Sequence, residues 1–178
     1  MNADVESVYY SQEQIQARVA ELGRRLEEFY TDKNPIFLCV LKGGCVFFAD
    51  LIRACAFPLE TRFIKASSYR DGVSSSGMVD ISGDAGTEIA GRHIVIVEDI
   101  LDTGITLKRM RAYLEELGPA SVSICVLLDK KERRVETVDA DYIGFSCDNL
   151  FFVGYGLDYA EKYRNLPYVG VLKPEIYS

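Results

Sequence analysis

The sequence predicts an α/β fold with a mostly parallel central sheet flanked by helices. The unbroken apolar runs at residues 36–41 and 94–97 and the mostly apolar run at 121–128 are typical of strands buried on both faces of a parallel sheet. Segments with apolar residues at helical spacing lie between these runs, which is the alternation expected of an α/β sheet. The chain has 178 residues, an ordinary length for one domain, so we expect a single domain over residues 1–178.

The N-terminal part predicts an amphipathic helix, a strand, a glycine turn and a second helix. Residues 12–29 can start at the N-cap Ser11 and carry apolar side chains at helical spacing: Ile15, Val19, Leu22, Leu26 and Phe29. Residues 36–41 form the first buried strand. The turn at 42–44 contains two glycines, and the apolar residues from Val46 to Ala54 predict the second helix.

A hairpin is predicted next. Residues 61–66 resemble a strand, and Val79 and Ile81 are expected on its returning arm. Residues 67–77 have almost no apolar content and many small residues, which predicts a mobile loop between the two arms.

The stretch 92–107 has the most distinctive pattern. The β-branched run 94–97 predicts a buried strand, and Glu98 and Asp99 stand at its carboxyl end. A short turn at 102–106 then precedes an amphipathic helix with apolar residues at Leu107, Met110, Leu114 and Leu117.

The C-terminal part predicts one more buried strand at 121–128, followed by a charged cluster at 129–134. Shorter strands are expected at 141–145, 150–155 and 168–172. Polar clusters at 42–44, 98–106 and 130–134 each follow a buried strand. Because ligands of α/β proteins bind beyond the carboxyl ends of the strands, these three clusters are expected to converge on one site.

Composition limits the class of protein. No apolar run approaches the roughly 18 residues of a membrane span, and the acidic N-terminal segment does not resemble a signal peptide, so we expect a cytoplasmic protein that binds no membrane. The formal net charge of −7 argues against binding to nucleic acid. Five scattered cysteines predict reduced thiols, and His93, the single histidine, excludes a site built on several histidines.

The turn at 102–106 has the chemistry of a phosphate site. Backbone N–H groups and the hydroxyls of Thr103 and Thr106 would stand at a helix N-terminus. The alternative is that Asp102 or Thr103 simply caps that helix. The neighbouring pair Glu98 and Asp99 favours the first interpretation, because two acids at a strand end are costly to desolvate unless they bind hydroxyls, cations or a metal.

These residues also carry a resemblance to a known family. The segment VEDILDTGIT at 97–106 resembles the phosphoribosyl pyrophosphate motif of type I phosphoribosyltransferases, in the form found in hypoxanthine-guanine phosphoribosyltransferases. Residues 41–44 resemble that family's pyrophosphate loop and 67–69 its mobile catalytic loop. Residues 127–130 resemble its purine-recognising lysine segment, and 153–166 its C-terminal signature.

The resemblance covers residues 36–177 and implies both fold and activity. It implies the type I phosphoribosyltransferase fold, with a core at about 30–145 and a small hood built from the N-terminal segment and about 146–178. The implied reaction is the Mg²⁺-dependent transfer of 5-phosphoribosyl from phosphoribosyl pyrophosphate to N9 of hypoxanthine or guanine, with xanthine as a further candidate. The implied assembly is a homodimer or a homotetramer.

The resemblance also implies roles for individual residues. Glu98 and Asp99 would hold the ribose hydroxyls, directly or through Mg²⁺, and Asp102 would be the catalytic base near N7 of the purine. An N-cap role remains the alternative for Asp102. The residues implied to bind phosphoribosyl pyrophosphate are Leu41, Lys42, Gly43, Ser68, Tyr69, Glu98, Asp99, Asp102, Thr103, Gly104, Ile105, Thr106 and Arg164.

Within that set, Lys42 and Gly43 belong to the pyrophosphate loop, where the family has a cis peptide between the residues that match Leu41 and Lys42. Arg164 would contact pyrophosphate, because its guanidinium suits phosphate oxygens. Ser68 and Tyr69 would lie on a loop that closes over the reaction.

The implied purine-binding residues are Lys130, Phe151, Phe152 and Asp158. Lys130 would donate to the 6-oxo group, and a donor at this place disfavours adenine. Phe151 would stack on the base and the backbone of Phe152 would meet its Watson–Crick edge, although two adjacent phenylalanines in a strand are more often core. Asp158 would also bind Mg²⁺, as a third metal-associated carboxylate beside Glu98 and Asp99.

Three segments depart from the family pattern: residues 70–73 in the mobile loop, Lys131, and residues 146–149 near the base pocket. Two other functions remain open: a nucleic-acid-binding regulator that keeps this fold, and a non-catalytic subunit. The acidic composition disfavours the regulator, and the presence of the implied catalytic residues disfavours the non-catalytic subunit.

Overall fold

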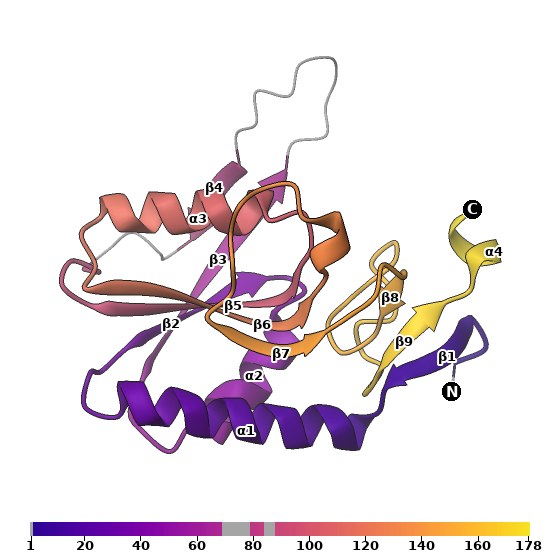
Figure 1. Ribbon diagram of the computed structural model, residues 1–178, viewed down its shortest axis with the longest axis horizontal. Helices are drawn as coiled ribbons and strands as arrows, with labels where there is room; N and C mark the ends of the chain where they lie inside the picture. Colours follow the sequence, from indigo (N-terminus) through magenta and orange to yellow (C-terminus); the bar gives the residue numbers. More distant parts are fainter. Residues whose placement is uncertain (1, 69–78, 84–87) are drawn as a thin grey trace, which may run out of the picture.

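The computed structural model describes residues 2–68, 79–83 and 88–178. A large six-stranded sheet forms the body of the molecule, and a small three-stranded sheet lies beyond one end of it (Figure 1). The large sheet has the order β4-β3-β2-β5-β6-β7 and the small one the order β1-β9-β8. The predicted α/β fold with a mostly parallel sheet and a small hood is therefore confirmed.

Five neighbouring strands of the large sheet are parallel: β3 (Glu60–Ser68), β2 (Ile36–Leu41), β5 (His93–Leu101), β6 (Ser121–Asp129) and β7 (Tyr142–Ser146). The edge strand β4 (Val79–Gly83) pairs antiparallel with β3, which confirms the predicted hairpin. Most of the loop expected at 67–77 falls outside the described residues. Strand β5 continues through Glu98 and Asp99, so the two acids lie within it and not beyond its end.

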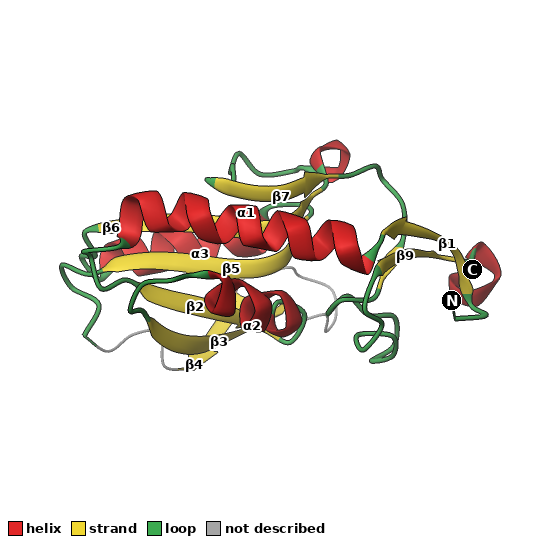
Figure 2. Ribbon diagram, turned by 90° about the horizontal axis from the view of Figure 1, so that it is seen from below, coloured by secondary structure: helices red, strands yellow, loops and turns green. Residues whose placement is uncertain are grey.

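Helices cover both faces of the large sheet. Helices α1 (Gln12–Tyr30) and α2 (Cys45–Ala54) lie on one face, and α3 (Ile105–Glu116) lies on the other (Figures 1 and 2). Alternate residues of each central strand enter two separate cores. In β5, for example, Val95 and Val97 pack with the helices of the first face, while Ile94 and Ile96 pack with α3. Burial of both faces explains the unbroken apolar runs.

Helix α1 begins as predicted and ends with one difference. The Ser11 side chain accepts a hydrogen bond from the backbone N of Gln14, and the Gln14 side chain accepts one from the backbone N of Ser11, which forms a capping box. Phe29 was expected on the packed face, but its side chain is 46% exposed, and Tyr30 is fully buried instead. Tyr30 follows Leu26 by four residues, and this spacing places both side chains on the same face of the helix.

The small sheet joins the two ends of the described chain. Strand β1 (Val5–Tyr10) pairs antiparallel with β9 (Val169–Leu172), which pairs antiparallel with β8 (Phe152–Val153). The strand predicted at 150–155 is thus only two residues long, because Gly154, Tyr155 and Gly156 have positive φ angles and turn the chain. The remaining elements of the described chain are a 3₁₀ turn, η2 (Lys131–Arg133), and a short helix, α4 (Pro174–Tyr177).

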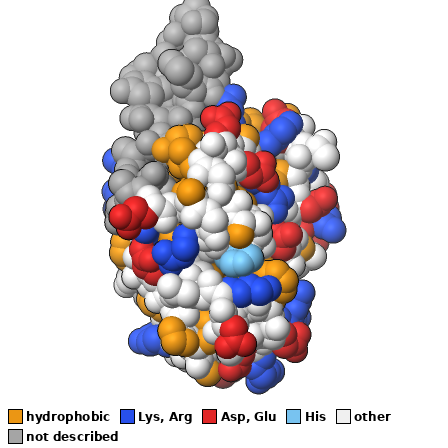
Figure 3. All heavy atoms as spheres, turned by 90° about the vertical axis from the view of Figure 1, so that its left-hand side faces the viewer, with side chains coloured by type: hydrophobic (Ala, Val, Ile, Leu, Met, Phe, Trp, Pro, Cys, Tyr) orange, Lys and Arg blue, Asp and Glu red, His pale blue; other side chains and the backbone are white. Residues whose placement is uncertain are grey.

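The surface carries charges of both signs. On the end that faces away from the small sheet, acidic and basic side chains are interspersed and no continuous basic patch is visible (Figure 3). Among the helices of the described chain, none combines the length and the apolar character needed to span a membrane.

Candidate active site

Two adjoining cavities open at the carboxyl ends of β2, β5 and β6, on the side of the small sheet. They share Ile100 and Asp102, at the end of β5 and just after it. Of the three polar clusters predicted to converge at strand ends, those at 98–106 and 130–134 reach these cavities, whereas residues 42–44 do not line them. Leu41, at the end of β2, also lines the first cavity.

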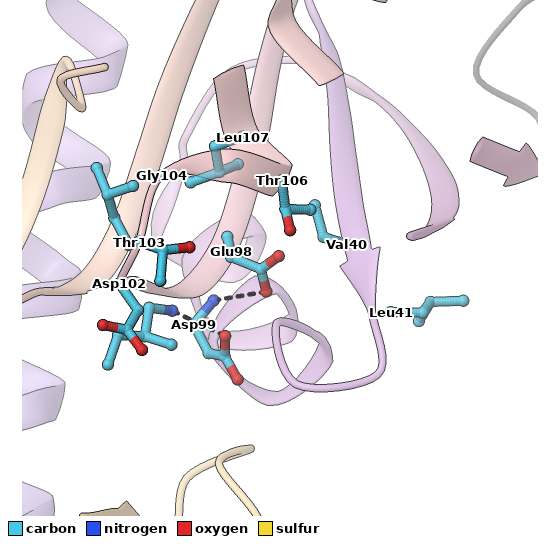
Figure 4. A pocket seen from close by; sticks show the side chains of 11 residues that line it. Val40, Leu41, Glu98, Asp99, Asp102, Thr103, Gly104, Thr106 and Leu107 are labelled. Carbon is cyan, nitrogen blue, oxygen red and sulfur yellow. Dashed lines mark hydrogen bonds between the residues drawn. The ribbon is translucent and has the colours of Figure 1, made fainter. Parts of the chain in front are cut away.

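The first cavity has a volume of about 230 Å³ and is largely acidic and hydroxylic (Figure 4). Its lining residues come from the end of β2, the end of β5 and the turn into α3: Val40, Leu41, Glu98, Asp99, Ile100, Leu101, Asp102, Thr103, Gly104, Thr106 and Leu107. Seven of the predicted phosphoribosyl pyrophosphate residues are therefore brought together around one space. Ile105 belongs to the same turn without lining the cavity.

Glu98 and Asp99 face different parts of this cavity because they are adjacent in a strand. In Figure 4 the Glu98 carboxylate lies near Thr106, while the Asp99 carboxylate points away from the turn. The Asp99 backbone N donates to Oε1 of Glu98 at 3.1 Å, and the Ile100 backbone N donates to Oδ1 of Asp99 at 2.8 Å. Burial, followed by the charge of Asp99, raises the pKa of Glu98 well above its usual range, and burial also raises the pKa of Asp99.

The turn into α3 leaves its backbone N–H groups available. The N-cap is Gly104, with a φ of 84°, and no side chain caps the helix, so the alternative that Asp102 or Thr103 is the N-cap does not hold. The Thr103 hydroxyl is 3.5 Å from the backbone N of Ile105, a long contact. An uncapped first turn beside two threonine hydroxyls provides several donors for an anion.

A charged segment after β6 holds this turn in place. The carbonyl of Thr103 accepts hydrogen bonds from the backbone N of Val135 at 2.9 Å and of Glu136 at 3.1 Å. The guanidinium of Arg134 donates to the carbonyl of Asp102 at 3.0 Å and also pairs with the buried carboxylate of Asp129. The conformation of the turn is thus fixed by protein contacts outside it.

Asp102 combines an exposed and a buried carboxylate oxygen. Its Oδ2 lies 3.5 Å from Nη1 of Arg133, whereas its Oδ1 is buried and has no hydrogen-bond partner among the described residues. A buried oxygen of this kind is costly unless a ligand supplies a donor. Asp102 stands on the boundary between the two cavities, so that donor can come from a ligand that occupies either of them.

The second cavity, of about 360 Å³, is more aromatic. It is lined by Ile100, Asp102, Lys130, Arg133, Asn149, Leu150, Phe151, Phe152, Leu157, Asp158 and Tyr177. Lys130 is only 6% exposed, and its Nζ donates to the carbonyl of Leu150 at 2.8 Å and lies 5.3 Å from the centre of the Phe152 ring. Because an ammonium group has three donors, two remain for a ligand in this cavity.

The two adjacent phenylalanines differ in their surroundings. Phe152 is 5% exposed and packs in the core of the α1 face, as its strand position would suggest. Phe151 is 36% exposed and borders the second cavity. A flat ligand can therefore reach the ring of Phe151, while Phe152 can offer its backbone.

The pyrophosphate loop lies close to the buried acids. The peptide between Leu41 and Lys42 is cis, as the resemblance implied. A Cβ on Gly43 would overlap Oδ2 of Asp99, and a Cβ on Gly156, whose φ is 103°, would overlap the carbonyl oxygen of Gly43. Glycines at these two positions allow the loop to pack between β5 and the segment that follows β8.

Four charged residues connect this loop to the C-terminal segment. Oε2 of Glu161 lies 2.8 Å from Nζ of Lys42, and Oε1 lies 3.6 Å from Nη2 of Arg164. Arg164 also pairs with Asp158 at 2.7 Å and donates to the carbonyl of Gly156 at 2.8 Å. The two cations predicted to bind pyrophosphate, Lys42 and Arg164, therefore both contact the Glu161 carboxylate.

Two predicted site residues, Ser68 and Tyr69, remain to be placed, and several residues at the site were not predicted. Ser68 is the last residue of β3, and Tyr69 lies outside the described residues. Ile100 was part of the recognised motif and Arg133 of the charged cluster, but neither was predicted to line the site. Glu161 lies inside the C-terminal signature at 153–166 but was given no role, and Tyr177 had no periodicity or motif that marked it. Among the described residues, no group of three or more His, Cys, Asp or Glu side chains is placed to hold a metal ion.

Comparison with known proteins identifies a family. The model of the phosphoribosyl transferase domain matches residues 7–160. The hypoxanthine-guanine phosphoribosyltransferase of Streptococcus pneumoniae is 47% identical over 175 residues, which are 98% of this chain and 97% of that protein. The hypoxanthine-guanine-xanthine phosphoribosyltransferase of Tritrichomonas foetus is 45% identical over 100% of this chain and 97% of that protein. A solved hypoxanthine phosphoribosyltransferase from Staphylococcus aureus is similar with a TM-score of 0.93 and 43% identity, over 98% of this chain and 95% of that one.

Proposed function

This chain belongs to the phosphoribosyltransferase family, and from that premise we propose how its residues carry out the reaction. It is a purine-salvage enzyme that transfers 5-phosphoribosyl from phosphoribosyl pyrophosphate to N9 of hypoxanthine or guanine. The bond between C1 of the ribose and the pyrophosphate oxygen breaks as the bond from C1 to N9 forms. The purine loses one proton, and the products are IMP or GMP and pyrophosphate.

One observation supports the proposed site above all others: the two cavities differ in chemistry and meet at Asp102. The acidic and hydroxylic cavity suits a ribose phosphate, and the aromatic cavity with a buried lysine suits a 6-oxopurine. A reaction that joins these two groups needs them side by side. Asp102 stands where the new bond would form.

In the first cavity, Glu98 and Asp99 are proposed to bind the vicinal ribose hydroxyls, which can donate to carboxylates. The 5-phosphate would lie against the uncapped turn, where the backbone N–H groups and the hydroxyls of Thr103 and Thr106 stabilise its charge. Gly104 and Ile105 contribute backbone donors to the same turn.

The residues fit Mg²⁺ as the cofactor. Glu98 and Asp99 are buried acids whose raised pKa values reflect the cost of their charge, and a divalent cation would relieve that cost. Mg²⁺ is commonly held by one or two carboxylates, with water and substrate phosphates as the other ligands. Asp158 is proposed as a further carboxylate for Mg²⁺, although it pairs with Arg164 in this structure. When bound, Mg²⁺ would neutralise charge on the pyrophosphate oxygens.

In the second cavity, Lys130 is proposed to donate to the 6-oxo group through a free ammonium hydrogen. The base would stack on Phe151, and the backbone of Phe152 would meet its Watson–Crick edge. An amino group at the 6-position would place donors against the donor of Lys130, so adenine should be excluded.

Asp102 is the proposed general base. Its buried Oδ1 lacks a hydrogen-bond partner among the described residues, and an N7–H group of the purine would supply that donor. As N9 bonds to C1, the proton on N7 becomes acidic and can pass to Oδ1.

The leaving pyrophosphate is proposed to lie at the loop of Leu41, Lys42 and Gly43. Lys42 and Arg164 would neutralise it, and both already face the same carboxylate, that of Glu161. Ser68 and Tyr69 are proposed to cover the site during the reaction.

We further propose that residues 1–178 act as one domain, that the enzyme forms a homodimer or homotetramer, and that it works in the cytoplasm. Free cysteines at all five positions suit a reducing compartment. Light scattering after size-exclusion chromatography would measure the assembly.

An assay of nucleotide formation tests the proposal. The protein is incubated with Mg²⁺, phosphoribosyl pyrophosphate and each of hypoxanthine, guanine, xanthine and adenine, and the product is followed by its ultraviolet absorbance. We expect product from hypoxanthine or guanine and none from adenine. No product from any 6-oxopurine, or product from adenine alone, would contradict the proposal. Tight, salt-sensitive binding of RNA or DNA without turnover would instead favour the regulator.

A further inference from the structure

The C-terminal helix places an aromatic ring at the proposed purine cavity. Tyr177, on α4, lines this cavity together with Phe151, Lys130 and Asp102. Its ring stacks on the ring of Phe151, with the ring centres 4.6 Å apart and the planes 19° apart. The sequence shows no motif or periodicity at this position, and the residue lies outside the C-terminal signature at 153–166.

Contacts with the small sheet fix the position of this helix. The backbone N of Lys173, its N-cap, donates to the carbonyl of Asp4 at 3.0 Å. Ile176 packs against a cluster formed by Val5, Val153 and Leu172. Because Ile176 is held in that cluster, the next residue, Tyr177, is directed toward Phe151.

Phe151 depends on aromatic neighbours for its orientation. It is 36% exposed and belongs to none of the buried clusters of the described chain. Tyr159 meets it edge to face, with centres 5.6 Å apart at 84°, and Tyr177 covers one of its faces. A ring packed on one face and along one edge keeps its other face available to a ligand.

From this geometry we propose that Tyr177 is a positioning residue for the purine: it holds the ring of Phe151 in the plane on which the base stacks. The inference rests on the proposed function, in which Phe151 is the stacking residue. The tyrosine ring performs this role, and its hydroxyl is not needed. Loss of the ring should weaken binding of the base and leave phosphoribosyl pyrophosphate binding unchanged, because the stack of Tyr177 on Phe151 lines the second cavity and not the first.

Steady-state kinetics on Tyr177→Ala, Tyr177→Phe and a control variant test the proposal. We expect Tyr177→Ala to raise KM for hypoxanthine about fivefold, the loss that one aromatic pair can cause. Its kcat and its KM for phosphoribosyl pyrophosphate should stay within about twofold of the wild type. Tyr177→Phe keeps the ring and should have the wild-type KM for hypoxanthine. The control is Glu175→Ala, an exposed substitution on the same helix, which should leave every parameter unchanged.

Calorimetric titration with GMP and with phosphoribosyl pyrophosphate separates this inference from the proposed function. If the wild type binds GMP and Tyr177→Ala binds it equally well, Tyr177 has no positioning role. A lower KM for hypoxanthine in Tyr177→Ala would mean that the tyrosine occupies the place of the base, which also overturns the proposal. A wild type that binds neither ligand would overturn the proposed function itself. Melting temperatures of the variants show whether a change in KM reflects general loss of structure.

Discussion

Oδ2 of Asp102 lies 3.5 Å from Nη1 of Arg133, while Oδ1 of the same carboxylate is buried without a hydrogen-bond partner in the described part of the chain. One oxygen of the carboxylate thus has a charged neighbour, and the other has no partner among the described residues. Asp102 lines both cavities, where a proton acceptor for the purine is needed. This arrangement suits a general base whose partner arrives with the substrate.

Asp102→Asn should lower kcat by roughly a hundredfold or more, because an amide cannot accept the purine proton. The KM for phosphoribosyl pyrophosphate should change by less than about twofold, since the backbone of the turn is unaffected. Initial-rate kinetics with hypoxanthine would measure both values. Unchanged turnover would remove Asp102 from the proton transfer.

Glu98→Gln should raise the stability of the protein without substrate and lower its affinity for phosphoribosyl pyrophosphate. Burial and the charge of Asp99 raise the pKa of Glu98, so above its unfolded pKa this carboxyl costs folding free energy that an amide avoids. We expect the melting temperature to rise by about 2–4 °C, which corresponds to about 1 kcal/mol. Affinity for phosphoribosyl pyrophosphate with Mg²⁺ should fall at least about tenfold, because a charged ligand for the cation is lost.

The pH dependence of protein stability tests whether the charge of Glu98 destabilises the folded protein. A carboxyl with a raised pKa in the folded state costs stability as pH rises above its unfolded pKa, which is about 4.3 for glutamate. The stability difference between Glu98→Gln and the wild type should therefore shrink as pH falls toward that value. Equal melting temperatures at pH 8 would show that the charge of Glu98 costs nothing.

Glu161→Gln should strengthen pyrophosphate binding. Glu161 contacts both Lys42 and Arg164, and pyrophosphate would have to displace it. Since exposed ion pairs are weak, the Kd for pyrophosphate at fixed Mg²⁺ should fall by only about two- to fivefold. Isothermal titration calorimetry at low salt would measure it, and the effect should decrease at high salt.

Glu116→Gln, at the end of α3, is the matched control for the change in net charge. It should leave the Kd unchanged. If Glu161→Gln instead weakens pyrophosphate binding, Glu161 serves to hold the two cations in place and does not compete with the ligand.

Arg134→Met should destabilise the protein much more than Arg133→Met. Arg134 pairs with Asp129, whose side chain is 3% exposed, and donates to the carbonyl of Asp102. Its loss would leave this buried carboxylate with one distant cation among the described residues, the Lys131 ammonium at 4.0 Å, at a cost of about 3 kcal/mol. Differential scanning calorimetry should show a melting temperature lower by roughly 6–12 °C.

The neighbouring Arg133 is half-exposed and contacts Asp102 alone among the described acids, so Arg133→Met should change stability little. Adding Asp129→Asn to Arg134→Met should recover part of the loss, because the uncompensated charge disappears. Equal destabilisation by both single variants would contradict the role assigned to Arg134.

The large sheet could be predicted from the sequence because burial on both faces leaves a run of apolar residues along the strand, as in β2, β5 and β6. Strand β1 gave no such signal. Its residues Glu6 to Val8 are exposed, and its pairing partner β9 lies at the other end of the chain. Helix α1 was predicted to within one residue, yet Phe29 and Tyr30 exchanged roles because spacings of three and four residues both suit a helix.

The site also contains residues that could be predicted from the sequence and residues that could not. Residues from strand ends, such as Asp99 and Lys130, could be expected to converge because parallel strands end at one edge of the sheet. Glu161 and Tyr177 could not be predicted in this way. Their positions depend on the path of the segment after β8, where Tyr155, Ala160 and Glu161 have positive φ angles that no periodicity indicates.

Because the site depends on the small sheet, catalysis should be lost under milder denaturing conditions than the structure of the large sheet. Phe151, Asp158 and Arg164 all lie on segments next to this sheet. One cluster of the sheet has only three buried residues, Val5, Val153 and Leu172, while its other buried residues join the core of the α1 face. The large sheet has an extensive core on each face and should withstand conditions that open the small one. Mild denaturation should therefore abolish turnover while most of the helical circular dichroism remains, and on refolding the activity should return last.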